Sequence, residues 1–118
     1  MPILSVISRF SAHALSSLIV QPGQALSISC QVSYSVTSYG TNWISQPAGK
    51  ALEWMGVIWS GGSTYYANSV QGRIGMTRDT SKKIVNLRLS TMRPEDSAVY
   101  YCARYTQWLK TYYATFFS

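Results

Sequence analysis

Hydrophobic and polar residues alternate along short stretches of this chain, with the period of two that is typical of half-buried β-strands. In 26–32, the residues Leu26, Ile28, Cys30 and Val32 fall on one face and polar residues separate them. In 84–89 the same alternation places Leu89 with two other apolar residues on one face. By alternation or by apolar content, further strands are expected at 42–46, 51–59, 64–66, 73–78 and 97–104.

Turn residues separate the expected strands. Pro22-Gly23 precedes the first, the stretch 47–50 (PAGK) predicts a hairpin turn, and the stretch 61–63 (GGS) predicts another. Ile19-Val20 indicates an edge strand before Pro22, and upstream of Ser16 the pattern fades. Since no helical stripe of useful length occurs, seven or eight short strands predict an all-β sandwich or barrel.

The size of the chain allows one domain with one core. It has 118 residues and 13.2 kDa, with 47% hydrophobic and 12% charged residues. Aromatic residues make up 14%, including nine Tyr and four Trp, which suits both a core and a contact surface. No run approaches the roughly 18 apolar residues of a membrane span, so we expect no direct membrane insertion of this segment.

The net charge of +6 comes from ten basic and four acidic residues. The basic residues are dispersed, so no nucleic-acid partner is expected. The densest group alternates with apolar residues, which predicts a solvated outer strand face, with an anion site as the alternative. This group comprises Arg73, Arg78, Lys82, Lys83, Arg88 and Arg93.

The chain contains two cysteines, Cys30 and Cys102, and one histidine, His13. These residues are too few and too far apart for a zinc site, so no metal is expected. A disulfide would close a long loop, contribute roughly 4 kcal/mol in the chain-entropy model, and imply an oxidising compartment. Two unrelated buried thiols or a redox pair are the alternatives.

Catalysis would need a nucleophile beside a base, paired acids or a metal cluster. One histidine and four acids without suitable spacing supply none of these, and Gly61-Gly62 opens no phosphate-binding helix. We therefore expect no enzyme, no catalytic residue and no cofactor.

The spacing around the cysteines is more specific. Trp43 follows Cys30 by 13 residues and Tyr100 precedes Cys102 by two. These positions match the buried tryptophan, the inter-sheet disulfide and the tyrosine corner of an immunoglobulin fold. Trp43, Tyr100 and Leu89 are therefore the expected core.

Four stretches resemble the framework of antibody heavy-chain variable domains: WI at 43–44, QPAGK at 46–50, LEWMG at 52–56 and EDSAVYYCAR at 95–104. The resemblance covers 17–104 and implies a V-type antiparallel β-sandwich with Greek-key connections. It also implies antigen recognition in adaptive immunity, outside the cell, as a secreted or cell-surface immunoglobulin.

The resemblance implies roles for individual residues. Arg73 and Asp96 would form an ion pair at the lower end of the sandwich. Four residues would face a light-chain variable domain, although ordinary core packing is an alternative for two of them, Leu52 and Trp54. The four are Gln46, Leu52, Trp54 and Tyr101.

Three segments match the family's antigen-contacting loops: 35–42, 58–66 and whatever follows Arg104. They mix aromatic residues with small polar ones, a composition typical of antibody binding surfaces. A supporting role in loop conformation is the alternative for Tyr34 and Tyr65. The expected antigen-binding residues are Ser38, Tyr39, Gly40, Asn42, Trp59, Ser60, Ser63, Tyr65, Tyr105 and Trp108.

Two other functions are compatible with the same residues. One is an innate or T-cell-receptor-like variable domain. The other is an adhesion-type immunoglobulin domain that binds one fixed protein through a sheet face.

Three features depart from the family pattern. Ser45 stands where an arginine is usual, near Glu53 and Asp96; if those carboxylates are undercompensated, a Ser45→Arg variant would be more stable by about 1–3 kcal/mol. Residues 105–118 lack the Trp-Gly-X-Gly motif and the last strand, which predicts an exposed edge beside the Cys102 strand, partly covered by Phe116 and Phe117. Residues 1–16 suggest a degraded leader or an irregular extension.

One hypothesis explains both termini. The chain is an unrearranged germline segment translated past its coding end, since the stretch 105–108 (YTQW) can be encoded by a recombination heptamer.

Overall fold

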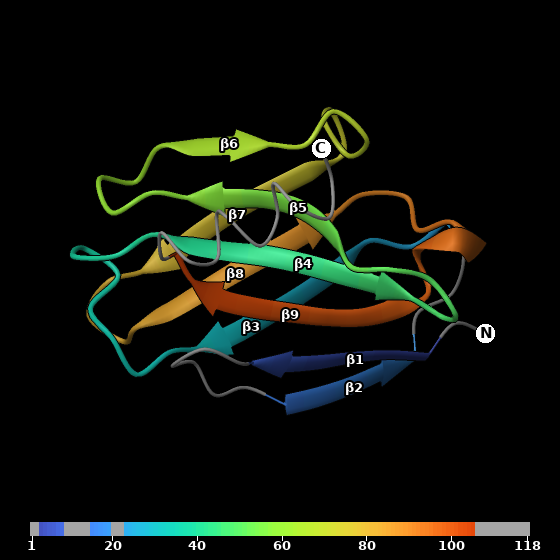
Figure 1. The fold of residues 1–118 in the computed structure, drawn as a ribbon, viewed down its shortest axis with the longest axis horizontal. Coiled ribbons are helices and arrows are strands. Elements are labelled where there is room, and N and C mark those ends of the chain that lie inside the picture. Colours follow the sequence, from blue (N-terminus) through green and yellow to red (C-terminus); the bar gives the residue numbers. More distant parts are fainter. Residues whose placement is uncertain (1–2, 9–14, 20–22, 106–118) are drawn as a thin grey trace.

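Two β-sheets lie face to face in the computed structural model, which describes residues 3–8, 15–19 and 23–105 (Figure 1). The larger sheet has the order β2-β1-β9-β4-β5-β6 and the smaller has the order β3-β8-β7. The chain changes sheet between β2 and β3, between β3 and β4, between β6 and β7, and between β8 and β9, which is Greek-key connectivity. The strands are β1 (Ile3–Ser8), β2 (Leu15–Ile19), β3 (Leu26–Gln31), β4 (Thr41–Pro47), β5 (Glu53–Ile58), β6 (Thr64–Tyr66), β7 (Ile74–Asp79), β8 (Ile84–Leu89) and β9 (Ala98–Arg104), with a short 3₁₀ helix η1 at Pro94–Asp96.

The all-β sandwich is confirmed; the strand pattern left a barrel open, and the spacing of Cys30, Trp43 and Cys102 favoured the sandwich. Each strand expected between 26 and 104 is present, and its ends lie within two residues of the prediction. The pairings among β3 to β9 are antiparallel. Alternation identified β3 and β8, which have one face against the opposite sheet, whereas β4 is buried along most of its length and was expected from its apolar content.

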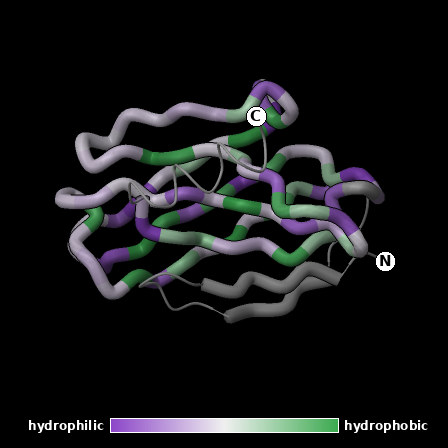
Figure 2. Tube along the Cα trace, viewed as in Figure 1, coloured by the Kyte–Doolittle hydropathy of each residue, from purple (hydrophilic) through white to green (hydrophobic). Residues whose placement is uncertain are grey.

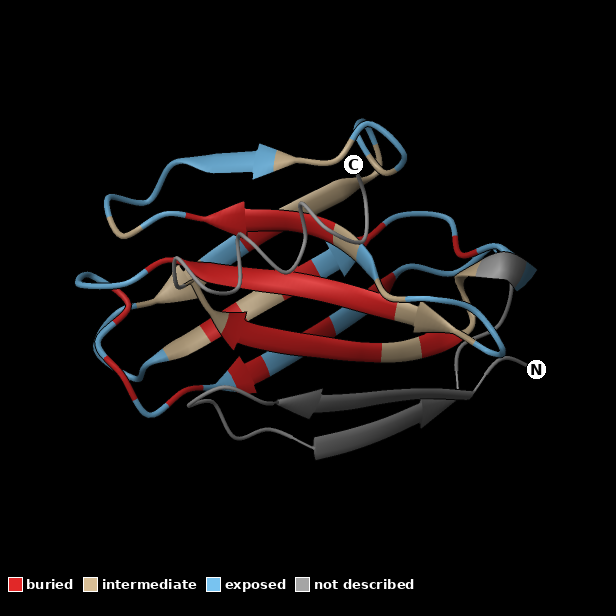
Figure 3. Ribbon diagram, in the orientation of Figure 1, coloured by how far each residue is buried: buried red, intermediate tan, exposed pale blue. Residues whose placement is uncertain are grey.

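The apolar faces meet between the sheets to form the main core. Hydrophobic segments recur along the strands in Figure 2, and both sheets contain buried segments in Figure 3. In the smaller sheet, Leu26 pairs with Leu89 and Cys30 pairs with Val85, so apolar positions of β3 and β8 share one face. In the larger sheet, Trp43 lies directly across from Cys102. The three expected core residues are at most 1% exposed: Trp43, Tyr100 and Leu89.

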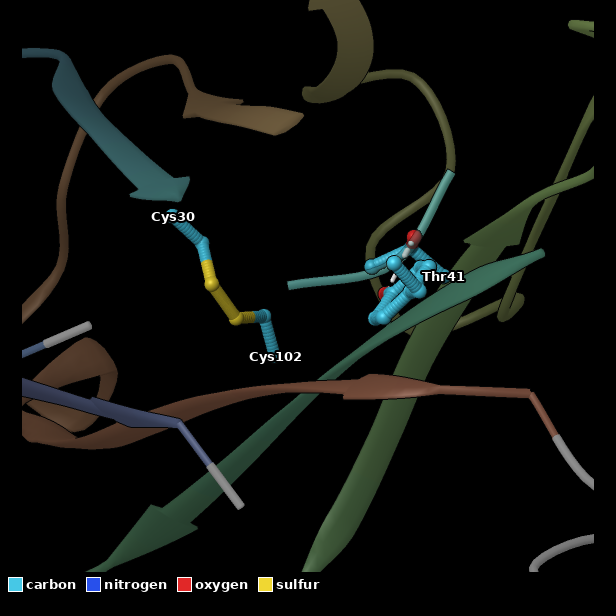
Figure 4. Close-up of a disulfide and its surroundings, with 4 residues drawn as sticks. Cys30, Thr41 and Cys102 are labelled. Carbon is cyan, nitrogen blue, oxygen red and sulfur yellow. Dashed lines mark hydrogen bonds between the residues drawn. A yellow bond between two sulfur atoms is a disulfide. The ribbon is translucent and has the colours of Figure 1, made fainter. Parts of the chain in front are cut away.

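A disulfide joins Cys30 of β3 to Cys102 of β9 and therefore crosses from one sheet to the other (Figure 4). Both cysteines are completely buried. The alternative of two unrelated thiols is therefore wrong. Because the link closes a loop of 72 residues, it restricts the unfolded chain strongly.

An ion pair lies at the end of the sandwich near η1. Arg73 donates to both carboxylate oxygens of Asp96, at 2.6 and 3.3 Å, and to the carbonyl oxygen of Thr91 at 3.0 Å. The Tyr100 hydroxyl donates to the carbonyl oxygen of Asp96 at 2.6 Å, and burial raises the pKa of Tyr100. Arg73 therefore does not belong to a solvated outer face, and that expectation is wrong for it.

The expectation that Ser45 leaves carboxylates undercompensated is also wrong. Asp96 is bonded by Arg73 and by the backbone N–H of Arg93 at 2.7 Å. Glu53 is exposed to water. Since neither carboxylate is buried without a partner, a Ser45→Arg variant gains at most the small free energy of a surface pair, about 0–1 kcal/mol.

The edge of β9 is paired, which corrects the expectation of an exposed edge. β1 lies beside β9 in parallel, with Val6 opposite Tyr100 and Ser8 opposite Cys102. β2 then pairs with β1 in antiparallel fashion. Residues 3–8 thus extend the sheet at the edge that was expected to be exposed. Phe116 and Phe117, which were expected to cover part of this edge, lie outside the described residues. The interpretation of 1–16 as a degraded leader or irregular extension stays a prediction.

We predict that Asp96→Ala lowers the free energy of unfolding by about 3 kcal/mol, because Arg73 would remain partly buried without its carboxylate partner. Denaturant unfolding measures the change. Glu53→Ala is the matched control, because it also removes one carboxylate, and it should shift the free energy by about 0.5 kcal/mol or less. Equal effects of the two substitutions would contradict the ion pair's role.

Candidate functional site

Three chain segments meet at one end of the sandwich (Figure 1). The first connects β3 to β4, the second connects β5 to β6, and the third follows β9. The backbone N–H of Tyr105 donates to the carbonyl oxygen of Gly40 at 2.7 Å, which joins the third segment to the first. These are the segments expected to bind ligand, and the fold brings their described parts together.

The second loop is a tight turn. Trp59 N–H donates to the carbonyl oxygen of Ser63 at 2.7 Å, and Gly62 N–H donates to that of Trp59 at 2.9 Å. Gly62 has φ of +99°, a conformation that other residues adopt only with strain. The turn therefore holds the Trp59 backbone in a fixed position.

The side chain of Arg78, in β7, is hydrogen-bonded to both the first loop and the second. Its Nη1 donates to the carbonyl oxygen of Val36 at 2.6 Å and to that of Trp59 at 3.1 Å. Arg78 comes two residues after the buried Met76 in β7, so strand alternation directs its side chain inward. The expectation of a solvated outer face is wrong here too; the inward parity of Arg78 was the signal in the sequence.

Aromatic side chains pack around Gly40. A Cβ at this position would meet Trp59 Cε3 at 3.2 Å and Tyr105 Cβ at 3.4 Å. The rings of Trp59 and Tyr105 meet edge to face, with centroids 4.8 Å apart. Glycine thus allows the second and third segments to close over the first.

Tyr34 anchors the first loop in the core. Its hydroxyl shares a hydrogen bond of 2.7 Å with Thr41, the residue labelled near the disulfide in Figure 4. Burial raises the pKa of Tyr34 to about 12, while the Thr41 hydrogen bond and the charge of Arg104 lower it. Tyr39 packs edge-on against Tyr34 and lies under Arg104, whose Cζ is 4.5 Å from the Tyr39 ring centroid.

The expected ligand-binding residues differ in accessibility. Tyr39, Trp59 and Tyr65 are exposed by 45%, 37% and 64%. Ser38 and Ser63 are exposed, Ser60 and Tyr105 are half-buried, and Trp108 lies outside the described residues. Gly40 and Asn42 are buried, so they can support the loops but do not face a ligand.

A second apolar cluster lies on the other face of the larger sheet. Ile44, Tyr101 and Ala103 are buried there, with half-buried Leu52, Trp54 and Val99 packed against them. Tyr101 donates to Gln46 at 3.2 Å and Trp54 Nε1 donates to Asn42 at 2.9 Å. The four residues expected to face a partner domain thus share one face and are separate from the main core.

The described residues contain no group of three His, Cys, Asp or Glu side chains that could hold a metal ion. In the same part of the chain, no helix is long and apolar enough to cross a membrane.

Comparison with known proteins agrees with this geometry. The model of a family described as the immunoglobulin V-set domain matches residues 15–115. The chain is 49% identical over 86 residues to a mouse (Mus musculus) protein, the Ig heavy chain V region MOPC 141, covering 72% of this chain and 60% of the relative. It is 48% identical over 86 residues to the Ig heavy chain V region XIG14 of Xenopus laevis, covering 72% of this chain and 64% of the relative. The aligned part is thus less than two thirds of each relative's length.

We predict that Arg78→Met speeds amide hydrogen exchange in residues 35–40 and 59–63 by about tenfold or more, because two loop carbonyls lose a charged donor. Mass spectrometry or NMR would measure the exchange. Arg88→Met removes a similar side chain from the exposed face of β8 and should leave the loops unchanged. Unchanged exchange in Arg78→Met would show that the loops hold together without it.

We predict that Tyr34→Phe reduces the loss of stability between pH 10 and 12. Below pH 10 the Tyr34 proton is bound in both the folded and unfolded states, so the stabilising difference is fully present. As the pH rises towards 12, the unfolded state loses this proton first and stability falls. Denaturant midpoints between pH 10 and 12 measure how steeply stability falls with pH. Tyr65→Phe, at an exposed tyrosine, is the control and should show the same fall as the unaltered chain.

Proposed function

Because the chain belongs to the immunoglobulin V-set family, we propose that it is a heavy-chain variable domain that binds antigen through the loops at the β3–β4 end. It would do so in adaptive immunity, outside the cell, in a secreted or cell-surface immunoglobulin. We assign it a binding role and no catalytic one. The heavy-chain V regions of mouse and Xenopus to which it is similar support this assignment.

The observation that carries the proposal is the contrast between accessible aromatic rings and a fixed backbone. Tyr39 and Trp59 present large surfaces to solvent, while Arg78 and the Trp59–Ser63 turn hold the backbone beneath. Rigid aromatic side chains bind with little loss of conformational entropy. Small polar neighbours, Ser38 and Ser63, add hydrogen-bonding groups that can adapt to a ligand.

The cluster around Tyr101 supports a light-chain variable domain as the partner. Leu52 and Trp54 are only half-buried in this chain, and an apolar sheet face of this kind gains free energy when a partner covers it. The hydrogen bond between Tyr101 and Gln46 leaves polar groups at the margin of the cluster. Pairing would place the loops of both domains side by side.

We predict that replacing the exposed residues of the first and second loops by alanine strongly weakens binding to a ligand. The ligand is first selected from a library for binding to the unaltered domain. The variant Ser38→Ala/Tyr39→Ala/Trp59→Ala/Tyr65→Ala should bind at least about a hundredfold more weakly, because aromatic anchors dominate such interfaces. The control variant Ser27→Ala/Ser29→Ala/Arg88→Ala alters the outer face of the smaller sheet. Loss of binding in the control with retention in the loop variant would favour the adhesion-type alternative.

The same protein is then mixed with a light-chain variable domain and examined by analytical ultracentrifugation. We expect a one-to-one complex, which Trp54→Ser weakens while the loop variant retains it. Absence of any complex would favour an innate or T-cell-receptor-like domain.

A further inference from the structure

The acidic residues of the chain are segregated from the ligand-binding end. Three of the four, Glu53, Glu95 and Asp96, lie at the opposite end, at the β4–β5 turn and in η1 (Figure 1). The fourth, Asp79, ends β7 near the loops, and its carboxylate accepts from Ser81 Oγ at 2.8 Å and from Lys82 N–H at 3.0 Å. These bonds lower the pKa of Asp79 and engage it in its own turn.

The cations at the loop end have different environments. The guanidinium of Arg78 is engaged by the carbonyl oxygens of the first and second loops. Arg104, the last residue of β9, is half-buried, and its Nε is buried without a hydrogen-bond partner. Within the described residues Arg104 forms no ion pair, since Arg73 and Asp96 make the one found there. Within the part of the chain that the structure describes, no carboxylate therefore compensates the positive charge of Arg104.

Aromatic faces surround this charge. Arg104 stacks over Tyr39, and Tyr39 adjoins Gly40, around which Trp59 and Tyr105 pack. The first two loops, 33–42 and 58–66, contain no acidic residue that could repel an anion. A guanidinium flanked by partly exposed aromatic rings attracts an anion while the rings stack on a flat ligand.

On the basis of the proposed function, we infer that the loop end favours ligands that carry an anionic oxygen group on a six-membered ring. Arg104 binds the anion, and Tyr39 and Trp59 contact the ring. An aryl phosphate and an acidic sugar share this chemistry. Uncharged rings would lack the ionic contact, and anions without a ring would lack the stacking.

Direct titration of the oxidised full chain tests the inference, with tryptophan fluorescence as the readout. The probes are two matched pairs: phenyl phosphate against phenol, and methyl glucuronide against methyl glucoside. We expect the charged member of at least one pair to bind about tenfold more tightly than its neutral partner, as one charged contact provides. The pair that shows the preference identifies the source of the ring.

Two single-charge variants locate the effect. Arg104→Gln should abolish the preference, whereas Arg88→Gln, which removes the same charge from the outer face of β8, should retain it. Equal binding of charged and neutral probes, or equal losses in both variants, would overturn the inference. Antigen binding through the loops would still stand if the loop variant described above loses its selected ligands, so the two failures are distinguishable.

Discussion

The covalent link between Cys30 and Cys102 fixes how far apart the two sheets lie, and the loop end depends on that spacing. The first loop leaves β3 in one sheet and enters β4 in the other, while the third segment continues from β9. Arg78 belongs to the smaller sheet and reaches carbonyl groups of both ligand-binding loops. A change in the separation of the sheets would break these bonds first, because hydrogen bonds tolerate only small changes in distance.

Strands β3 and β8 were predictable because each has one buried and one outward face, which the period of two records directly. Strand β4 is buried along most of its length and was predictable from its apolar content and the turn that follows it. The core residues followed from the same pattern and from the spacing of Cys30, Trp43 and Cys102. The burial and the hydrogen-bond partners of the basic residues were not predictable from their charge alone. Arg73 and Arg78 donate to acceptors that lie 23 and 42 residues away in sequence, and the local pattern around a basic residue does not identify such a distant partner.

The β1 strand shows a different limit. The stretch 3–8 (ILSVIS) is largely apolar without strict alternation, so its sequence does not indicate one buried face. It pairs with β9, whose edge would otherwise leave backbone N–H and C=O groups without partners. Such an edge can form hydrogen bonds with an extended segment that lies within reach. Such a pairing depends on which strand edges the rest of the chain leaves without a hydrogen-bonded neighbour. It cannot be derived from the local pattern.

The composition of the chain gives a net charge of +6, which by itself suits many partners. Folding distributes that charge unevenly, because the carboxylate of Asp96 is paired with Arg73 at one end, whereas at the other end Arg104 stacks on Tyr39 and forms no ion pair among the described residues. The distance between the two ends exceeds the screening length of physiological salt, about 8 Å, in a molecule 37 Å long. The carboxylates at the far end therefore contribute little to the field at the loops, and the carboxylate of Asp79, which lies near the loops, is bonded within its own turn.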